Sequence, residues 1–540
     1  MKDYKNNSCV SVVGGSGSDA ALESAFSILT GREDGNDLSA VVQRGRDGLL
    51  YFLNDNCWWR YVDFQCTFHA TYGWRPFFDS DYRLIDYNTW SLCFKHQADQ
   101  EMIDEWRKVF PCVPPVGFLP QNAYPLDRVV VSVENFFNNF RVFQPEWSAD
   151  SPDPYADKYD LFDREGRHDT NHDYPLLNTI TAADWLLWER DIDRAPMFCR
   201  QIEMFLDVVF DKMSGGLILI GPQGSQIEFG HGGFRYPSST NIYLLKSLRS
   251  LREVYLMLGE TEKAESAEEK AYYLESKIGM LKHESGWWLS GLSSDFKERL
   301  GTGEIEGESG YFEVWPNVNS VVLDISSSVE AEAIVNRIAS VPALVDNHLT
   351  LSNYPARPLS ELDDDHDGFP PPGTHLNGGW FWMHGGSALA SFARVRHEDT
   401  IMRLSELLED HANHFSVDCY NDWGRNKESQ WKHLHVDGPT YSVTCAGSFG
   451  MIFRAILGVS AFADGLRFAP AVPLDVDSIS FIRPINYGGR PVYVSVKGSG
   501  GNISEAYIDG QPYFGHDAAS LIVNPKDLEN GSKLEIIMGE

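Results

Sequence analysis

The chain has 540 residues, of which 43% are hydrophobic and 13% aromatic, and its formal net charge at pH 7 is −32. This length fits two or three average domains, or one large domain with an appendage, and the composition is that of a well-packed globular protein. Because nucleic acids and anionic membranes bind basic patches, the charge argues against both as partners. It also disfavours polyanionic substrates, so a neutral substrate fits the chain best.

The eight cysteines are scattered, with no CxxC pair and no Cys/His cluster at zinc spacing. We therefore expect reduced core thiols, no metal site and no cofactor. The start, Met1–Asn7, lacks the apolar run of a signal peptide. The sequence also contains no run of about 18 uncharged apolar residues, the length needed to span a membrane. The sequence predicts a cytoplasmic protein, although a secreted protein whose leader had been removed would read the same.

Residues 1–145 show the least regular pattern. Short aromatic runs at 48–53 and 58–62 predict strands, and a helix is predicted over about 88–109. An acidic linker with three prolines follows at 145–173. The first 145 residues are therefore predicted to be either a β-rich region or divergent first hairpins of the next domain.

From residue 173 the pattern changes to paired helices, because apolar residues recur every three to four positions. Gly259 is predicted to end one of these helices as its C-cap. Four connecting loops, 214–240, 283–316, 346–379 and 415–441, are much longer than helix packing requires, and such loops are usually functional. The helices are predicted at about 176–186, 198–209, 244–258, 264–278, 317–325, 328–340, 380–396, 399–413 and 442–457.

Helical hairpins arranged in a closed ring, with the long loops at one end, explain this pattern best. After Gly465 the period changes to two, with turns at Gly-Gly, Asp-Gly and Asn-Gly pairs. The sequence thus predicts a helical domain at 146–465 and a small β-sandwich-like tail at 466–540.

The segment Asn377-Gly378-Gly379-Trp380-Phe381-Trp382 opens one of the predicted helices. Its glycines allow a tight turn and close approach to a ligand, and Trp380 and Trp382 offer flat faces on which sugar rings stack. The alternative is that both tryptophans are core residues, as is predicted for Trp185 and Trp188.

The hairpin domain, followed by Gly465-Leu466-Arg467-Phe468-Ala469-Pro470 and a β tail, resembles the six-hairpin, (α/α)6-barrel glycosidases. That group includes trehalases, debranching glucosidases, mannosyl-oligosaccharide glucosidases, α-L-rhamnosidases and disaccharide phosphorylases. The stretches 216–259, 376–382 and 439–447 resemble it too, so the likeness covers about 170–540. The resemblance implies a mainly α fold, an (α/α)6 toroid. The usual rhamnosidase acid signature is not visible.

Enzymes of this group mostly hydrolyse with inversion, which requires one carboxylic acid and one carboxylate base about 6.5–9.5 Å apart. The resemblance places the acid in the loop before the 244–258 helix, where Glu228 lies between Ile227 and Phe229. Apolar neighbours raise a carboxyl pKa and favour the protonated acid. The similar enzymes usually have Asp here, and the alternative is an exposed loop Glu.

The base is expected in the loop after the Trp380 helix pair. Glu428 and Asp418 both qualify, and Glu428 is favoured because it lies between Trp423 and Trp431. Its neighbour Lys427 would equally suit a solvated ion pair.

Other residues are predicted to bind the substrate. His172 and Asp173 precede the first clear helix, where carboxylates can clamp sugar hydroxyls, although Asp173 before Pro175 is also a good N-cap pattern. The remaining predicted binders are His231, Arg357, Trp380, Trp382, Trp423 and Trp431. The acidic run 363–367 is interpreted as a solvated charge run rather than a calcium site.

Together these features predict an inverting, exo-acting glycoside hydrolase that acts on a neutral oligosaccharide or glycoside. One alternative is an inverting disaccharide phosphorylase, in which phosphate replaces the water. Another is a non-catalytic carbohydrate-binding protein on the same fold. The sequence predicts neither the sugar nor the oligomeric state.

Overall fold

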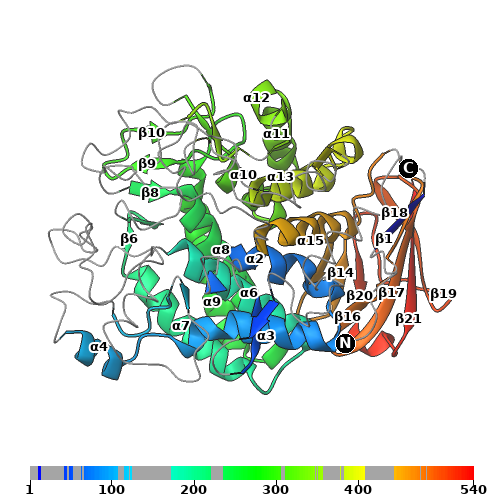
Figure 1. Ribbon diagram of the computed structural model, residues 1–540, viewed down its shortest axis with the longest axis horizontal. Coiled ribbons are helices and arrows are strands. Elements are labelled where there is room, and N and C mark those ends of the chain that lie inside the picture. Colours follow the sequence, from blue (N-terminus) through cyan, green and yellow to red (C-terminus); the bar gives the residue numbers. More distant parts are fainter. Residues whose placement is uncertain are drawn as a thin grey trace.

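A computed structural model of the protein shows a mainly α-helical architecture with several small sheets (Figure 1). The helices occupy the centre and left of that view, and the largest sheet stands at its right. The structure describes residues 10–13, 42–44, 48–52, 62–63, 66–107, 115–120, 122–123, 172–220, 235–305, 310–346, 348–349, 351–356, 378, 382–404, 406–407, 443–474, 476–481 and 483–539.

Most of the predicted paired helices are present. Gly259, at φ +75°, ends α8 in the left-handed conformation expected of a C-cap. Residues 400–404 and 406–407 are helical as well, and the rest of that predicted helix lies outside the described residues. The pairs are α6 (Asp173–Glu189) with α7 (Ala195–Phe210), α8 (Ser238–Leu258) with α9 (Thr261–Ile278), and α10 (Val314–Val322) with α11 (Ser328–Ala339); α13 (Trp382–Arg394) and α15 (Val443–Leu457) follow.

The prediction of one helix over 88–109 is wrong. Two helices, α3 (Ser80–Lys95) and α4 (Gln100–Trp106), occupy this region. The Asp79 carboxylate accepts hydrogen bonds from two backbone N–H groups at the start of α3. Asp99 accepts one from Met102 N at 2.8 Å at the start of α4. Two N-caps therefore define the boundaries that apolar periodicity alone did not indicate.

Before α3, the chain forms α2 (Cys66–Phe68), the π-helical turn η1 (His69–Gly73) and the 3-10 turn η2 (Arg75–Phe77). We call these together the first inner segment. The other inner segments are α6, α8, α10, α13 and α15. Each packs against the next in that order, and α15 packs against η1, which also contacts α6. The outer helices α3, α7, α9 and α11 follow their inner partners in the chain.

The inner helices run in the same direction, because their contacts keep step along the helix. At the start of α6, Asp173 accepts a hydrogen bond from Thr240 of α8 at 2.5 Å. About two turns further along both helices, Thr179 and Ser247 are 2.7 Å apart between hydroxyl oxygens. In the second turn of α10, Asn319 donates to the hydroxyl of Tyr243 in the second turn of α8.

Glycines allow the last inner helices to approach closely. A Cβ atom added at Gly386 of α13 would lie 2.3 Å from the Cβ of Ser448 in α15. One added at Gly450 of α15 would lie 2.7 Å from the indole of Trp74. Because real Cβ atoms do not approach other atoms so closely, only glycine fits where α13, α15 and the first inner segment meet.

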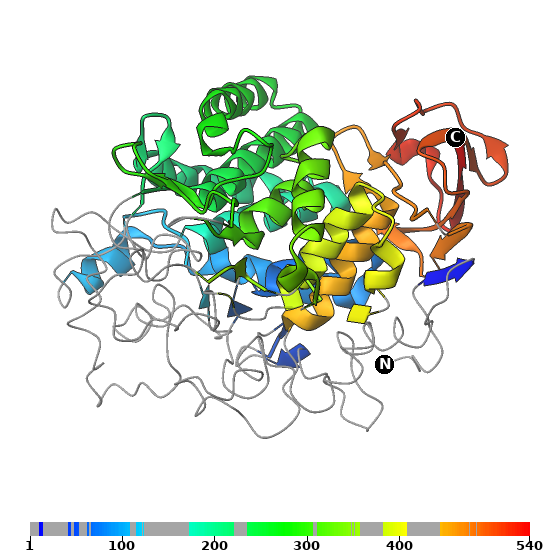
Figure 2. The same ribbon diagram turned by 90° about the horizontal axis from the view of Figure 1, so that it is seen from above.

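The C-terminal sheet has seven strands in the order β1-β15-β17-β21-β18-β19, and β16 also pairs with β17. β17 and β21 are parallel, and the other pairs are antiparallel. β1 adds to the edge of this sheet from near the start of the chain (Figures 1 and 2), a pairing that the sequence did not predict. The strands are β1 (Val10–Val13), β15 (Ser478–Phe481), β16 (Ile485–Tyr487), β17 (Arg490–Lys497), β18 (Asn502–Ile508), β19 (Gln511–Pro512) and β21 (Ser532–Gly539).

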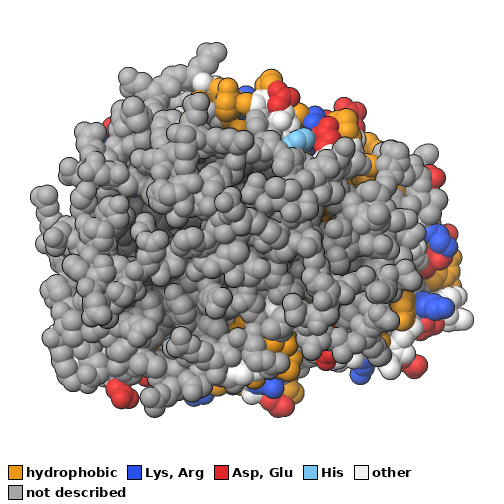
Figure 3. All heavy atoms as spheres, viewed as in Figure 1, with side chains coloured by type: hydrophobic (Ala, Val, Ile, Leu, Met, Phe, Trp, Pro, Cys, Tyr) orange, Lys and Arg blue, Asp and Glu red, His pale blue; other side chains and the backbone are white. Residues whose placement is uncertain are grey.

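One face of this sheet is buried and the other is polar. In β17, Val492, Val494 and Val496 are buried, and the side chains between them are at least partly exposed. On the exposed face Lys497 and Glu535 form an ion pair at 2.5 Å. Figure 3 shows basic and acidic side chains side by side along its right-hand edge, where this sheet lies.

The other strands are short. β3 lies within the predicted run 48–53 and confirms a strand there. The predicted domain boundaries at 145 and 465 stay predictions. The strands are β2 (Val42–Arg44), β3 (Leu50–Phe52), β4 (Val62–Asp63), β5 (Asn122–Ala123), β6 (Met213–Ser214), β7 (Leu217–Ile218), β8 (Arg235–Pro237), β9 (Gly291–Ser293), β10 (Arg299–Leu300), β11 (Phe312–Glu313), β12 (Asn353–Tyr354), β13 (Val459–Ala461), β14 (Leu466–Phe468) and β20 (Leu521–Val523).

The C-terminal strands contact the ends of the inner segments rather than their starts. Arg190, directly after α6, donates to the carbonyl oxygens of Phe462 and Ala463 at 3.2 and 2.7 Å. Asn486 of β16 donates to the carbonyl oxygen of Phe78, the residue after η2, at 2.6 Å. The candidate site described below lies at the opposite end, where the inner segments begin. Among the described helices, none is long and apolar enough to cross a membrane.

Candidate active site

Polar and aromatic side chains gather where the inner segments begin. His69 of η1, Asp173 of α6, Thr240 of α8, Trp315 of α10 and His384 of α13 all lie in the first turn or two of their segments and are at most 1% exposed. We call these five residues the helix-start cluster. They come from five of the six inner segments, so the packing of those segments determines their arrangement.

Asp173 connects two of these segments. Its carboxylate accepts hydrogen bonds from Thr240 Oγ1 at 2.5 Å and from Ser239 Oγ at 3.0 Å. The alternative that Asp173 is the N-cap is wrong, because His172 occupies that position and Asp173 is the first helical residue. Its side chain accepts hydrogen bonds across to α8. Beside it, the ring of buried His172 meets Phe118 edge to face, with centroids 5.6 Å apart.

Trp315 forms the centre of an aromatic group. Its ring centroid lies 5.5 Å from that of His69 and 4.9 Å from that of His384. Nε2 of His69 lies 3.1 Å from the hydroxyl of Ser387, one turn beyond His384 on α13. The sequence analysis did not select these residues. The available signals were that Trp315 ends a long loop and that His384 follows the Gly-Gly-Trp segment.

Tyr243, in the second turn of α8, is a buried tyrosine near this group. Asn319 Nδ2 donates to the hydroxyl of Tyr243 at 2.7 Å. Burial raises the pKa of Tyr243 well above its ordinary value, and the charge of nearby Asp173 raises it further. Tyr243 is therefore a neutral hydroxyl near neutral pH.

A second buried carboxylate precedes α10. Glu313 of β11 is 2% exposed and accepts a hydrogen bond from Ser290 Oγ at 3.0 Å. It too was missed from sequence, where it reads as one acid within a long aromatic loop. Within the described residues, no group of three or more His, Cys, Asp or Glu side chains is arranged to hold a metal ion.

Most residues predicted to act on the substrate lie outside the described part of the chain. The segment 221–234, with Glu228 and His231, leads into β8 and the start of α8. The segment 408–442 leads into the start of α15. The side chain of Trp382, the first residue of α13, is also outside the description. The others are Arg357, Trp380, Asp418, Trp423, Glu428 and Trp431, and the acidic run 363–367 belongs with them. The segments that contain the predicted acid and the predicted base therefore lead into the starts of α8 and α15.

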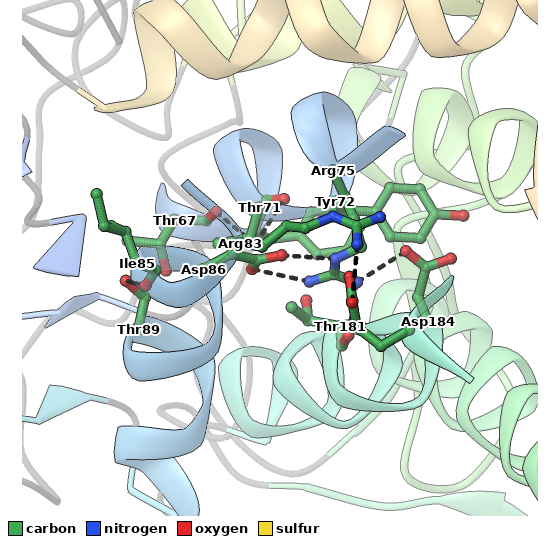
Figure 4. A network of polar contacts seen from close by, with 12 residues as sticks. Thr67, Thr71, Tyr72, Arg75, Arg83, Ile85, Asp86, Thr89, Thr181 and Asp184 are labelled. Carbon is green, nitrogen blue, oxygen red and sulfur yellow. Dashed lines mark hydrogen bonds and ion pairs between the residues drawn. The ribbon is translucent and has the colours of Figure 1, made fainter. Parts of the chain in front are cut away.

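The other end of the inner segments carries a network of paired charges, Arg75, Asp86, Asp184 and Arg454, which we call the far-end network. Figure 4 shows Arg75 between Asp86 and Asp184. Arg75 contacts Asp86 through two hydrogen bonds of 2.7 and 2.9 Å and Asp184 through one of 2.8 Å. Arg454 donates to both oxygens of Asp184, at 2.7 and 3.0 Å. Near it, Trp185 and Trp188 are buried, as predicted for core residues.

The two acids of this network titrate differently. Burial raises the pKa of Asp86, and Arg75 only partly offsets this. Burial also acts on Asp184, but the charges of Arg454 and Arg75 together lower its pKa. Because every member has an oppositely charged partner, the network closes the packing between the first and last inner segments.

No protein-family model and no curated protein matches this chain. Among solved structures, it is similar to the GH63 mannosylglycerate hydrolase from Thermus thermophilus in complex with glucose, at 11% identity and a TM-score of 0.46, over 76% of this chain and 96% of that one. It is also similar to the GH92 alpha-mannosidase from Bacteroides thetaiotaomicron, at 9% identity and a TM-score of 0.44, over 98% and 56% of the two chains.

A third similar structure is the GH78 family rhamnosidase of a Bacillus species, at 12% identity and a TM-score of 0.41, over 64% of this chain. This chain spans 34% of the rhamnosidase's length. All three similarities are low, so the function proposed below rests on this chain's own residues.

Proposed function

We propose that the protein is an inverting, exo-acting glycoside hydrolase of a neutral oligosaccharide or glycoside, with its site at the helix-start end. The observation that carries the proposal is the convergence of the inner-segment starts on Trp315, its two flanking histidines and the buried carboxylate of Asp173. Flat aromatic faces stack on sugar rings, and carboxylates accept hydrogen bonds from sugar hydroxyls.

We propose further that six hairpins form an (α/α)6 toroid. The succession of contacts between inner segments, from the first through α15 and back, supports this arrangement. The catalytic domain is proposed at 146–465, with the β tail at 466–540 and the protein in the cytoplasm.

In this proposal Glu228 is the general acid and Glu428 the general base, with Asp418 as the alternative base. Inversion requires two carboxyl groups about 6.5–9.5 Å apart, with room for a water between them. The two loops lead into α8 and α15, and both helices start at the same end. His172, Asp173, His231, Arg357, Trp380, Trp382, Trp423 and Trp431 are proposed to bind the sugar, together with Trp315 and His384.

The first experiment is to incubate the protein with a panel of aryl glycosides and neutral oligosaccharides, with and without phosphate, and to determine product mass and anomer by NMR. We expect a free sugar of inverted configuration, independent of phosphate. A phosphate-dependent sugar 1-phosphate would instead indicate a phosphorylase. Sugar binding by calorimetry without product would indicate a binding protein.

Variants then test the site. Glu228→Gln and Glu428→Gln are expected to lower kcat about 10²- to 10⁴-fold, the usual contribution of a general acid or base. Asp418→Asn, in the same loop as Glu428, tests the alternative base: it should retain most of the activity if Glu428 is the base, whereas a loss confined to Asp418→Asn would assign the base to Asp418. Folded Glu→Gln variants with full turnover would show that these site assignments are wrong.

A further inference from the structure

An aromatic surface lies beside the helix-start end and has no part in the proposed reaction. Phe296, in the turn between β9 and β10, is 39% exposed, and Tyr273, near the end of α9, is 52% exposed. Two glycines, Gly215 and Gly216, lie between them in the turn from β6 to β7. We call Phe296 and Tyr273 the aromatic platform.

The backbone of Phe296 is unusual for a bulky residue, because its φ of +60° lies in the left-handed region. The turn is held in place by its own hydrogen bonds. Asp295 Oδ1 accepts from Ser293 Oγ at 2.8 Å and from Lys297 N at 3.1 Å, and Ser293 Oγ accepts from Glu298 N at 2.9 Å. Strained backbone that its surroundings keep in place is typical of functional positions.

The ring of Phe296 is also held in one orientation. One face stacks on the buried Tyr236 of β8, with centroids 4.2 Å apart and an interplanar angle of 20°. The ring edge lies against the Gly215 backbone, where an added Cβ would come within 2.9 Å of Cζ. One face and one edge of the ring are therefore in contact with Tyr236 and Gly215, and the residue is still 39% exposed.

Tyr273 is on the other side of the same glycine turn. A Cβ added at Gly216 would lie 3.1 Å from the Tyr273 hydroxyl and 2.7 Å from Cγ of Lys277. The Lys277 ammonium lies 5.8 Å from the Tyr273 ring centroid. A Cβ at either glycine would clash with a neighbouring side chain, so the glycine turn packs closely between Phe296 and Tyr273 and carries no side chain that could cover either ring.

The platform lies at the same end as the helix-start cluster. Tyr236 belongs to β8, which runs directly into the start of α8. α9 packs against α8 after a tight turn at Gly259, so its final residues return to the end where α8 begins. Figure 1 shows β6, β8, β9 and β10 together at the left of the view, away from the C-terminal sheet.

We propose that Phe296 and Tyr273 bind sugar units beyond the one that reacts, which makes an oligosaccharide or polysaccharide the substrate rather than a disaccharide. This proposal rests on the proposed glycosidase function. Exposed rings held rigidly can stack on the C–H faces of sugars at little entropic cost. The area of two rings is far smaller than the roughly 800 Å² per partner that a stable protein interface buries, and this favours a small ligand over a protein partner.

The test compares two substrates in the full-length enzyme. Phe296→Gly removes the ring while tolerating the left-handed backbone, so the turn is expected to keep its shape. Together with Tyr273→Ala, it should raise KM about tenfold for an oligosaccharide of four or more units and leave kcat unchanged, whereas KM for a short aryl glycoside should stay the same. Phe514→Ala, which removes an 87% exposed ring from the C-terminal region, is the matched control.

Equal changes with both substrates, or no change with either, would overturn the proposal, as would a changed oligomeric state of Phe296→Gly by light scattering. Thermal melting checks that each variant is folded. If the wild-type enzyme hydrolyses no substrate, the proposed function fails. Sugar binding by the platform is then tested separately, by electrophoresis through gels that contain neutral polysaccharides. Retardation of the wild type but not of Phe296→Gly would support the platform, and equal migration of both would overturn it.

Discussion

The two ends of the inner segments handle buried charge in different ways. In the far-end network, Asp86 and Asp184 are matched by Arg75 and Arg454 at hydrogen-bonding distance. In the helix-start cluster, the Asp173 carboxylate accepts hydrogen bonds from neutral hydroxyls. Removing one member of a buried ion pair leaves an unpaired charge, whereas neutral donors can be exchanged for those of a ligand. The comparison distinguishes residues that stabilise the fold, at the far end, from residues that are proposed to bind the substrate, at the helix starts.

The largest effect is expected at the far end. Arg454→Met leaves Asp184 with only Arg75 and is expected to lower the free energy of unfolding by about 3–5 kcal/mol. Urea denaturation measures this change. In the double variant Arg454→Met/Asp184→Leu, part of the loss should return because no charge is left unpaired there. A loss below about 1 kcal/mol in the single variant would contradict the assigned role.

At the helix-start end the effect should fall on activity. Asp173→Asn replaces a carboxylate that accepts two hydroxyl donors, and we expect kcat/KM per folded molecule to fall about ten- to hundredfold. Its melting temperature should change less than that of Arg454→Met, which is the internal control. If Asp173→Asn lost stability but kept full activity, the two ends would not differ in the proposed way.

A packing variant tests the closure of the inner segments without changing charge. Gly450→Ala places a Cβ against Trp74 and is expected to cost about 1–3 kcal/mol of unfolding free energy. Gly279→Ala is the matched control, because nothing lies within 4 Å of a Cβ added there and its φ is −57°. Chemical denaturation should show little or no loss in the control. Equal losses in both would mean that close packing at Gly450 is unimportant.

The smallest effect concerns a partly exposed ion pair, which is the solvated counterpart of the far-end network. Glu330 caps α11 and accepts a hydrogen bond from Lys282 at 2.6 Å. Although partial burial raises the pKa of Glu330, hydrogen bonds from Lys282 and Ser327 lower it below its ordinary value.

Because the folded-state pKa is the lower one, the stabilisation is present above the unfolded value near pH 4 and is lost as pH falls. Glu330→Gln should remove about 0.5 kcal/mol at pH 7 and flatten the acid limb of stability against pH. An unchanged acid limb would contradict the pairing. The comparison variant is Glu406→Gln, which removes the acid of another partly exposed ion pair, the one between Arg403 and Glu406.

Local patterns in the sequence determined most helices and the β tail. Apolar residues at helical spacing gave correct positions for α6 through α11, and Gly259 ended α8 because a left-handed C-cap is a local property of the backbone. The start of α3 and the break before α4 have local signals as well, the N-caps Asp79 and Asp99, but apolar periodicity alone does not report them.

Only the tertiary structure decided which distant residues meet. β1 joins β15 at the opposite end of the chain, and Trp315 of α10 lies between His69 of η1 and His384 of α13, three segments far apart in the sequence. Asp173 reads as a cap from sequence, yet it bonds across to Thr240. Periodicity reports which face of a helix is buried but not which partner covers it, and the partner depends on packing between elements far apart in the chain.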